Sequence, residues 1–122
     1  MEEAVAGKLT RILWVSRHPL EECQGEALRQ AFGGIEVISH DRDLNSASEI
    51  IDVFVARECD EMVVVLSLHL HADLIQELEE RGLSVRPMVA IMRRMRMEGD
   101  ETIFTFDHFE RILRLHMETE RV

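Results

Sequence analysis

Hydroxyl, guanidinium and imidazole side chains follow the predicted strands of this chain, and together they suit a phosphate or a phosphodiester. They are Ser16, Arg17 and His18 after the first strand, Ser67, His69 and His71 after the third, and Arg93 and Arg94 after the fourth. Arginine pairs with two phosphate oxygens at once, and histidine exchanges protons near neutral pH. His40 and Asp41 follow the second strand. Whether these residues form one site depends on the elements that position them.

Those elements are four short apolar runs separated by amphipathic segments. The runs are 11–16, 35–39, 62–66 and 87–92, and helices are expected from Pro19, from Ser46 with a capping box to Glu49, and over 71–81. Short, nearly continuous apolar runs are typical of strands covered on both faces. A βαβαβαβ order over 9–94 predicts a parallel sheet, and right-handed crossovers favour the strand order 2-1-3-4. We therefore expect one α/β domain over 1–122, a Rossmann-like three-layer sandwich.

The end of the chain carries a different pattern. Residues 102–106 and 111–119 alternate between apolar and polar side chains, and 107–110 separate them. Alternation with a period of two is typical of half-buried strands. We expect a C-terminal β-hairpin over 101–120 that extends or flanks the sheet.

The predicted sheet has one edge that suits ligand binding. In open α/β sheets, ligands bind beyond the carboxyl ends of the strands, where the direction of chain winding reverses. With the order 2-1-3-4 this point lies between the first and third strands, so 16–18 and 67–71 should meet there. Arg93 and Arg94 should leave the fourth strand on the same edge. Two helix N-termini, with free N–H groups and a positive dipole end, should lie beside them and favour an anion.

Other roles stay open for the same residues. His18 is equally suited to cap the first helix, and Arg93 and Arg94 are equally suited to be solvated charges beside nearby acids. His69 and His71 form an H-x-H pair. Two histidines without a further Cys, His or Asp cluster indicate a metal site only weakly, and we expect none.

Composition and missing motifs argue against several classes of function. The net charge of −10 opposes binding to a long nucleic acid, which needs a broad basic face. No apolar run reaches the roughly 18 residues that span a bilayer. The start of the chain lacks the basic flank and apolar core of a signal peptide, so we expect a cytoplasmic protein. Neither G-x-G-x-x-G nor G-x-x-x-x-G-K-[ST] occurs, and no cofactor is expected.

Two motifs resemble those of a known group. W-V-S-R-H-P-L at 14–20 and L-S-L-H-L-H-A at 66–72 are similar to strand exits in small CRISPR-associated ancillary proteins, which are related to CARF ligand-sensing domains. The resemblance covers these two motifs, and 106–112 do not match it. It implies a Rossmann-like fold, a homodimer, and binding of cyclic oligoadenylate, the second messenger of type III CRISPR defence. Some members cleave this ligand as ring nucleases.

On that resemblance, Arg17 is expected to hold a phosphate while His18 or His69 moves a proton in a metal-independent cleavage. The remaining candidates are expected to bind the ligand; they are Ser16, Ser67, His71, Arg93 and Arg94. Binding without cleavage stays open, as does another small phosphate ligand. The main alternative is a non-catalytic, homodimeric protein-interaction module that uses the hairpin as its partner surface.

Overall fold

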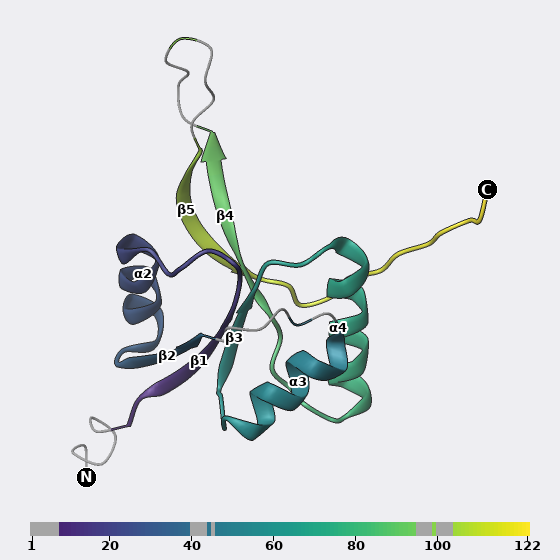
Figure 1. Cartoon of the computed structure of the whole chain (residues 1–122), viewed down its shortest axis with the longest axis horizontal. Coiled ribbons are helices and arrows are strands. Elements are labelled where there is room, and N and C mark those ends of the chain that lie inside the picture. Colours follow the sequence, from purple (N-terminus) through teal and green to yellow (C-terminus); the bar gives the residue numbers. More distant parts are fainter. Residues whose placement is uncertain (1–7, 40–43, 45, 95–98, 100–103) are drawn as a thin grey trace.

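The fold is an α/β arrangement with a mixed five-stranded sheet (Figure 1). The computed structural model describes residues 8–39, 44, 46–94, 99 and 104–122. The elements in chain order are β1 (Thr10–Val15), α2 (Glu22–Phe32), β2 (Ile35–Ser39), α3 (Ala47–Ala56), β3 (Glu61–Val64), α4 (Leu68–Glu80), β4 (Met88–Arg94) and β5 (Phe104–Arg111). The strand order is β2-β1-β3-β4-β5, with β5 antiparallel to β4 and the other pairs parallel. The predicted α/β class is confirmed, and the first four strands agree with the predicted order 2-1-3-4.

Alternate side chains of β1 fill two cores on opposite faces of the sheet. Leu13 and Val15 belong to the core that α3 and α4 cover. Ile12 and Trp14 belong to the core that α2 covers. Because both faces are buried, the strand needs apolar side chains at every position, which explains the uninterrupted apolar run in the sequence.

Local capping decides where the helices begin. Ser46 caps α3 as predicted, since its hydroxyl accepts the Glu49 N–H at 3.2 Å. At α2, Glu21 and Gln24 form a capping box, so the helix begins at Glu22 rather than at Pro19. None of the helices in the described part of the chain combines the length and the apolar character that crossing a bilayer requires.

The last two strands leave the sheet as a two-stranded ribbon. β4 pairs with β3 at Met88, which lies opposite Val63. The rest of β4 pairs with β5, from Met88 opposite Arg111 to Arg94 opposite Phe104. Figure 1 shows this pair projecting beyond the helices. We call β4 and β5 together the β4–β5 ribbon.

The C-terminal hairpin differs from its prediction over 101–120. Its expected turn at 107–110 is part of a single strand, β5, whose partner is β4. A bulge between Ile91 and Met92 absorbs an extra residue on β5. The bulge lets Phe106 and Phe109 share a face, with ring centroids 4.8 Å apart. Packing between these two rings stabilises the strand across the polar residues at 107–110. Residues 112–122 follow as an extended segment that is not assigned to a strand, and 101–103 lie outside the described residues.

Candidate functional site

The exits of β1 and β3 lie side by side at the carboxyl edge of the sheet. Val15 pairs with Val64, and the Val65 N–H donates to the Val15 carbonyl at 3.0 Å. Residues 16–18 and 65–69 therefore start from neighbouring strand ends, from which the first stretch runs toward α2 and the second toward α4 (Figure 1); we call these two stretches the β1–β3 edge. This is the meeting point that the strand order 2-1-3-4 implies.

The first stretch is held by its own hydrogen bonds. The indole N–H of Trp14 donates to the His18 carbonyl at 2.8 Å. The His18 N–H donates to the Ser16 hydroxyl at 3.1 Å. Ser16 therefore shapes the turn, while the side chains of Arg17 and His18 are exposed at the surface. The hydrogen bond from Trp14 was not predicted, because a tryptophan within a buried strand indicates only a core side chain.

The second stretch is the start of α4. The Ser67 hydroxyl accepts the Leu70 N–H at 3.3 Å, and the Ser67 carbonyl accepts the His71 N–H at 2.9 Å. The helix thus begins at Leu68, three residues before the predicted start at 71, because Ser67 caps it. Ser67 has a capping role, and His69 stands exposed in the first turn.

His71 does not face solvent as expected for a ligand-binding residue. It shares the inward stripe of α4 with Leu74, Ile75 and Leu78, at helical spacing. Its exposed fraction is 7%, and its buried Nδ1 has no hydrogen-bond partner in the part of the chain that the structure describes. Burial lowers the pKa of His71 below its usual range. The reason for this burial is its spacing, since position 71 lies three, four and seven residues before Leu74, Ile75 and Leu78 on the helix.

Two helix N-termini were predicted at this edge, and acidic side chains offset the positive end of one of them, α2. At α2, the Glu21 carboxylate accepts an N–H of the first turn, and Glu22 adds a second acid there. The first turn of α4 contains no acidic residue. Since the first N–H groups of a helix lack intrahelical partners, the start of α4 is the end that remains suited to an anion.

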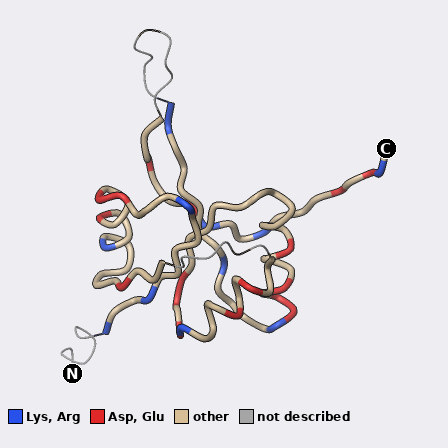
Figure 2. Tube along the Cα trace, in the orientation of Figure 1, with Lys and Arg blue, Asp and Glu red and all other residues tan. Residues whose placement is uncertain are grey.

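Arg93 and Arg94 are carried away from the β1–β3 edge. They are the last two residues of β4, and Figure 2 shows the end of this strand in blue, the colour of Lys and Arg. Arg93 is five residues beyond Met88, the residue paired with β3, which corresponds to about 17 Å of strand. Its guanidinium lies 3.8 Å from the Asp107 carboxylate. The prediction placed them at the edge because it did not foresee that β4 leaves the sheet. His40 and Asp41 lie outside the described residues.

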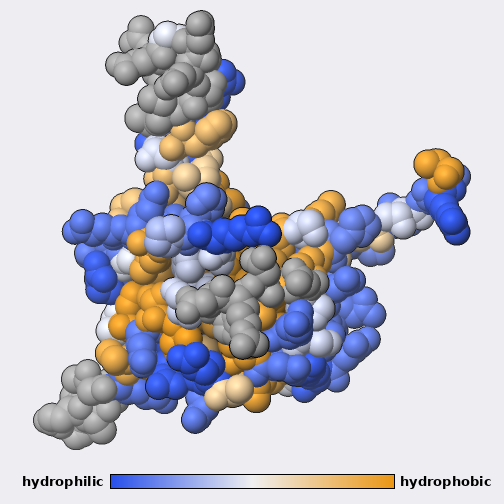
Figure 3. Space-filling view, viewed as in Figure 1, coloured by the Kyte–Doolittle hydropathy of each residue, from blue (hydrophilic) through white to orange (hydrophobic). Residues whose placement is uncertain are grey.

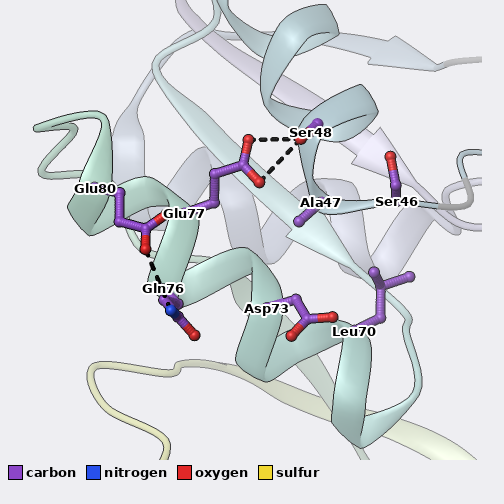
Figure 4. A pocket seen from close by; sticks show the side chains of 8 residues that line it. All are labelled: Ser46, Ala47, Ser48, Leu70, Asp73, Gln76, Glu77 and Glu80. Carbon is purple, nitrogen blue, oxygen red and sulfur yellow. Dashed lines mark hydrogen bonds between the residues drawn. The ribbon is translucent and has the colours of Figure 1, made fainter.

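A shallow groove of about 360 Å³ lies between the start of α3 and the outer side of α4 (Figure 4). Its lining includes the carboxylates of Asp73, Glu77 and Glu80. Glu77 accepts hydrogen bonds from the Ser48 hydroxyl at 2.9 and 2.7 Å, and these bonds together with Arg81 lower the pKa of Glu77. Three carboxylates disfavour an anionic ligand, so this groove is not part of the candidate anion site.

Comparison with protein-family models, with curated proteins and with solved structures gives no match. The functional argument therefore rests on the geometry of this chain. Among the described residues, no three His, Cys, Asp or Glu side chains come together as metal ligands.

The candidate site thus consists of Arg17, His18, His69 and the first N–H groups of α4. One guanidinium, two imidazoles and a helix N-terminus can bind a phosphate group and exchange a proton with it. Ser16 and Ser67 shape the two stretches. The E-E-C-Q sequence at 21–24 could have indicated that a capping box with acidic residues forms at the start of α2 and disfavours an anion there.

Proposed function

We propose that this chain binds a small phosphate-bearing ligand at the β1–β3 edge, and that the ligand is a cyclic oligoadenylate. The proposal includes a Rossmann-like sensing domain that acts as a cytoplasmic homodimer in type III CRISPR defence. The observation that carries it is the hydrogen bond of 3.0 Å from the Val65 N–H to the Val15 carbonyl. That bond makes the exits of β1 and β3 neighbours; the turn with Arg17 and His18 follows one exit, and the start of α4 follows the other.

Local charge supports this choice of ligand within an acidic chain. The net charge of −10 repels anions in general, so an anion needs a place where cationic groups and helix N–H groups converge. At the β1–β3 edge, Arg17 brings a permanent positive charge, and the first turn of α4 has no acid to oppose it. Phosphate is the anion that an arginine and a helix start bind best together.

Cleavage of the bound ring is a second step of the same proposal. The ribose 2′-oxygen would form a bond to the adjacent phosphorus, and the bond from that phosphorus to the 5′-oxygen would break. His18 or His69 would take the proton from the 2′-hydroxyl, and the leaving 5′-oxygen would receive a proton from the other histidine or from water. Arg17 would stabilise the charge on the phosphate oxygens. The products would be linear oligonucleotides with a 2′,3′-cyclic phosphate.

The test is calorimetric titration of the full chain with cyclic tetra-adenylate and cyclic hexa-adenylate, with EDTA present. We expect one ring to bind, and the double variant Arg17→Ala, His18→Ala to lose at least about tenfold in affinity, since a charged hydrogen bond contributes more than 1.4 kcal/mol. Arg114→Ala, at an exposed position outside the edge, is the matched control and should bind normally. Failure of both rings to bind would refute the proposal, and binding of inorganic phosphate alone would refute cyclic oligoadenylate as the ligand. Chromatography of the ring after incubation reports cleavage separately.

A second candidate function, a protein-interaction module, is favoured by one observation. Phe104 and Met92 on the β4–β5 ribbon are 61% and 45% exposed. Large apolar side chains gathered on one exposed element often mark a protein-binding surface. The same double variant separates the two functions, because a module that uses the ribbon would keep its protein partner when Arg17 and His18 are replaced.

A further inference from the structure

One face of the β4–β5 ribbon carries a continuous aromatic stripe. Phe109 lies opposite Ala90, Phe106 opposite Met92, and Phe104 opposite Arg94. Residues directly opposite each other share a face, and the ring contact between Phe106 and Phe109 shows that the face continues across the bulge. At the inner end, Phe109 meets Trp14 edge-on, with centroids 6.4 Å apart. The stripe therefore runs from the α2-side core out along the ribbon.

Exposure increases along this stripe from the core to the tip. Trp14 is buried, Phe109 and Phe106 are half-buried, and Met92 and Phe104 are 45% and 61% exposed. Among the residues that the structure describes, α2 packs against the inner end of the stripe and reaches no further than the base of the ribbon (Figure 1). The outer half thus offers a surface that matches the core in chemistry but is open to solvent (Figure 3).

The two ends of this region carry opposite charges. β4 ends in two arginines, Arg93 and Arg94, and the guanidinium of Arg93 lies 3.8 Å from the Asp107 carboxylate of β5 (Figure 2). The base adjoins the start of α2, because Leu20 packs into the same apolar cluster as Phe109. Glu21 and Glu22 follow Leu20 directly and are exposed. A basic tip and an acidic base on one patch complement each other when two copies of the patch are antiparallel.

We propose that a second copy of this chain covers the stripe in a two-fold arrangement, with the ribbon tip of each copy against the α2 start of the other. A two-fold axis brings the same patch together with itself, so the patch must contain both halves of every contact. This patch does so, because the aromatic stripe pairs with itself and Arg94 faces the acids of Glu21 and Glu22. The proposal assigns the surface of the homodimer named in the proposed function and does not depend on the ligand.

The area required supports the inclusion of α2. Two strands of about 25 Å length and 4.8 Å spacing offer only roughly 250 Å² of flat face. A stable dimer buries about 800 Å² from each partner, so ribbon-to-ribbon contact alone is too small. The proposed dimer surface therefore includes the exposed side of α2 in addition to the face of the ribbon.

The test is sedimentation equilibrium of the full chain from micromolar to submillimolar concentration, without ligand. We expect the unmodified protein to be a dimer, and Phe104→Gln with Met92→Gln to raise its dissociation constant at least about tenfold. Leu113→Gln is the matched control, because Leu113 is 70% exposed but lies outside the ribbon. Far-UV circular dichroism of each variant checks that the ribbon still folds.

A charge exchange tests the orientation of the two copies independently of ribbon folding. Arg94→Glu should weaken the dimer by like-charge repulsion with Glu21 and Glu22, and adding Glu22→Arg in the same chain should restore part of the affinity. A monomer at every concentration, or a dimer that all these variants leave unchanged, would overturn the proposal. Since ligand titration is measured separately, a monomer that still binds cyclic oligoadenylate would overturn the dimer surface alone.

Discussion

The indole N–H of Trp14 donates to the main-chain carbonyl of His18 at a distance of 2.8 Å. This contact joins the buried strand β1 to the exposed turn that carries Arg17 and His18. The same ring also meets Phe109 edge-on, with centroids 6.4 Å apart. Trp14 therefore links the candidate anion site to the base of the aromatic stripe on the β4–β5 ribbon.

Replacing Trp14 by phenylalanine should loosen this turn while keeping an aromatic ring in the core. The variant loses one hydrogen bond and some buried volume, so we expect the free energy of unfolding to fall by about 1–3 kcal/mol. Urea unfolding followed by circular dichroism measures it. Phe109→Leu is the comparison, since it removes the ring contact but leaves the bond to His18. Affinity for the ligand should fall more in Trp14→Phe than in Phe109→Leu, and an equal fall would contradict a positioning role for the indole.

His71 should make the protein less stable as the pH falls. Burial lowers its pKa in the folded state, while the unfolded chain has the ordinary value of about 6.5. Below that value the unfolded state binds more protons than the folded state, so stability rises with pH in this window and is lost on acidification. Urea midpoints measured between about pH 5 and pH 8 should show this slope. The slope should be smaller in His71→Leu, and an unchanged slope would count against the buried neutral imidazole.

His108 should have the opposite pH dependence. Its ring lies 2.7 Å from the Glu110 carboxylate and 2.6 Å from that of Asp107, and these hydrogen bonds raise its pKa. A raised pKa means that the stabilisation is complete below about pH 6.5 and is lost as the pH rises through the folded-state value. Proton NMR titration of the ring should give a pKa above the ordinary value. In Asp107→Asn with Glu110→Gln it should return toward that value, and no change between the two proteins would rule out the carboxylates as the cause.

Glu21 should matter for stability but not for ligand binding. Its carboxylate caps α2, so Glu21→Ala should lower the free energy of unfolding by about 1 kcal/mol, and Glu21→Ser should restore most of it. Thermal unfolding checks both variants. Because the anion is assigned to the start of α4, neither variant should reduce its affinity. A loss of affinity in Glu21→Ala would move the site toward α2.

The parallel part of the fold was predictable from the sequence because burial on two faces leaves a simple pattern. Residues 62–66 and 35–39 read as strands from their apolar runs alone, and the order 2-1-3-4 followed from the handedness of crossovers. The ribbon was not predictable in the same way. Phe106 and Phe109 are three apart, which breaks the period of two, and the bulge that puts them on one face is a property of the pairing with β4.

The candidate site was predicted in part. The adjacency of the ends of β1 and β3 followed from topology, which sequence patterns can indicate. The positions of individual side chains did not follow from topology, because they depend on how a helix is oriented and on where a strand leaves the sheet. His71 lies on the buried stripe of α4, and the departure of β4 from the sheet after Met88 removes Arg93 and Arg94 from the edge.

The most direct test of the central claim is a titration of isotope-labelled protein with cyclic oligoadenylate, followed by backbone amide NMR. If one phosphate sits between the two strand exits, the amides of Arg17, His18 and His69 should shift together and give the same dissociation constant. Amides beside Asp73 and Glu77, in the acidic groove, should stay unchanged and serve as the internal control. Shifts confined to one of the two stretches, or to the groove, would contradict the claim that the β1–β3 edge is the binding site.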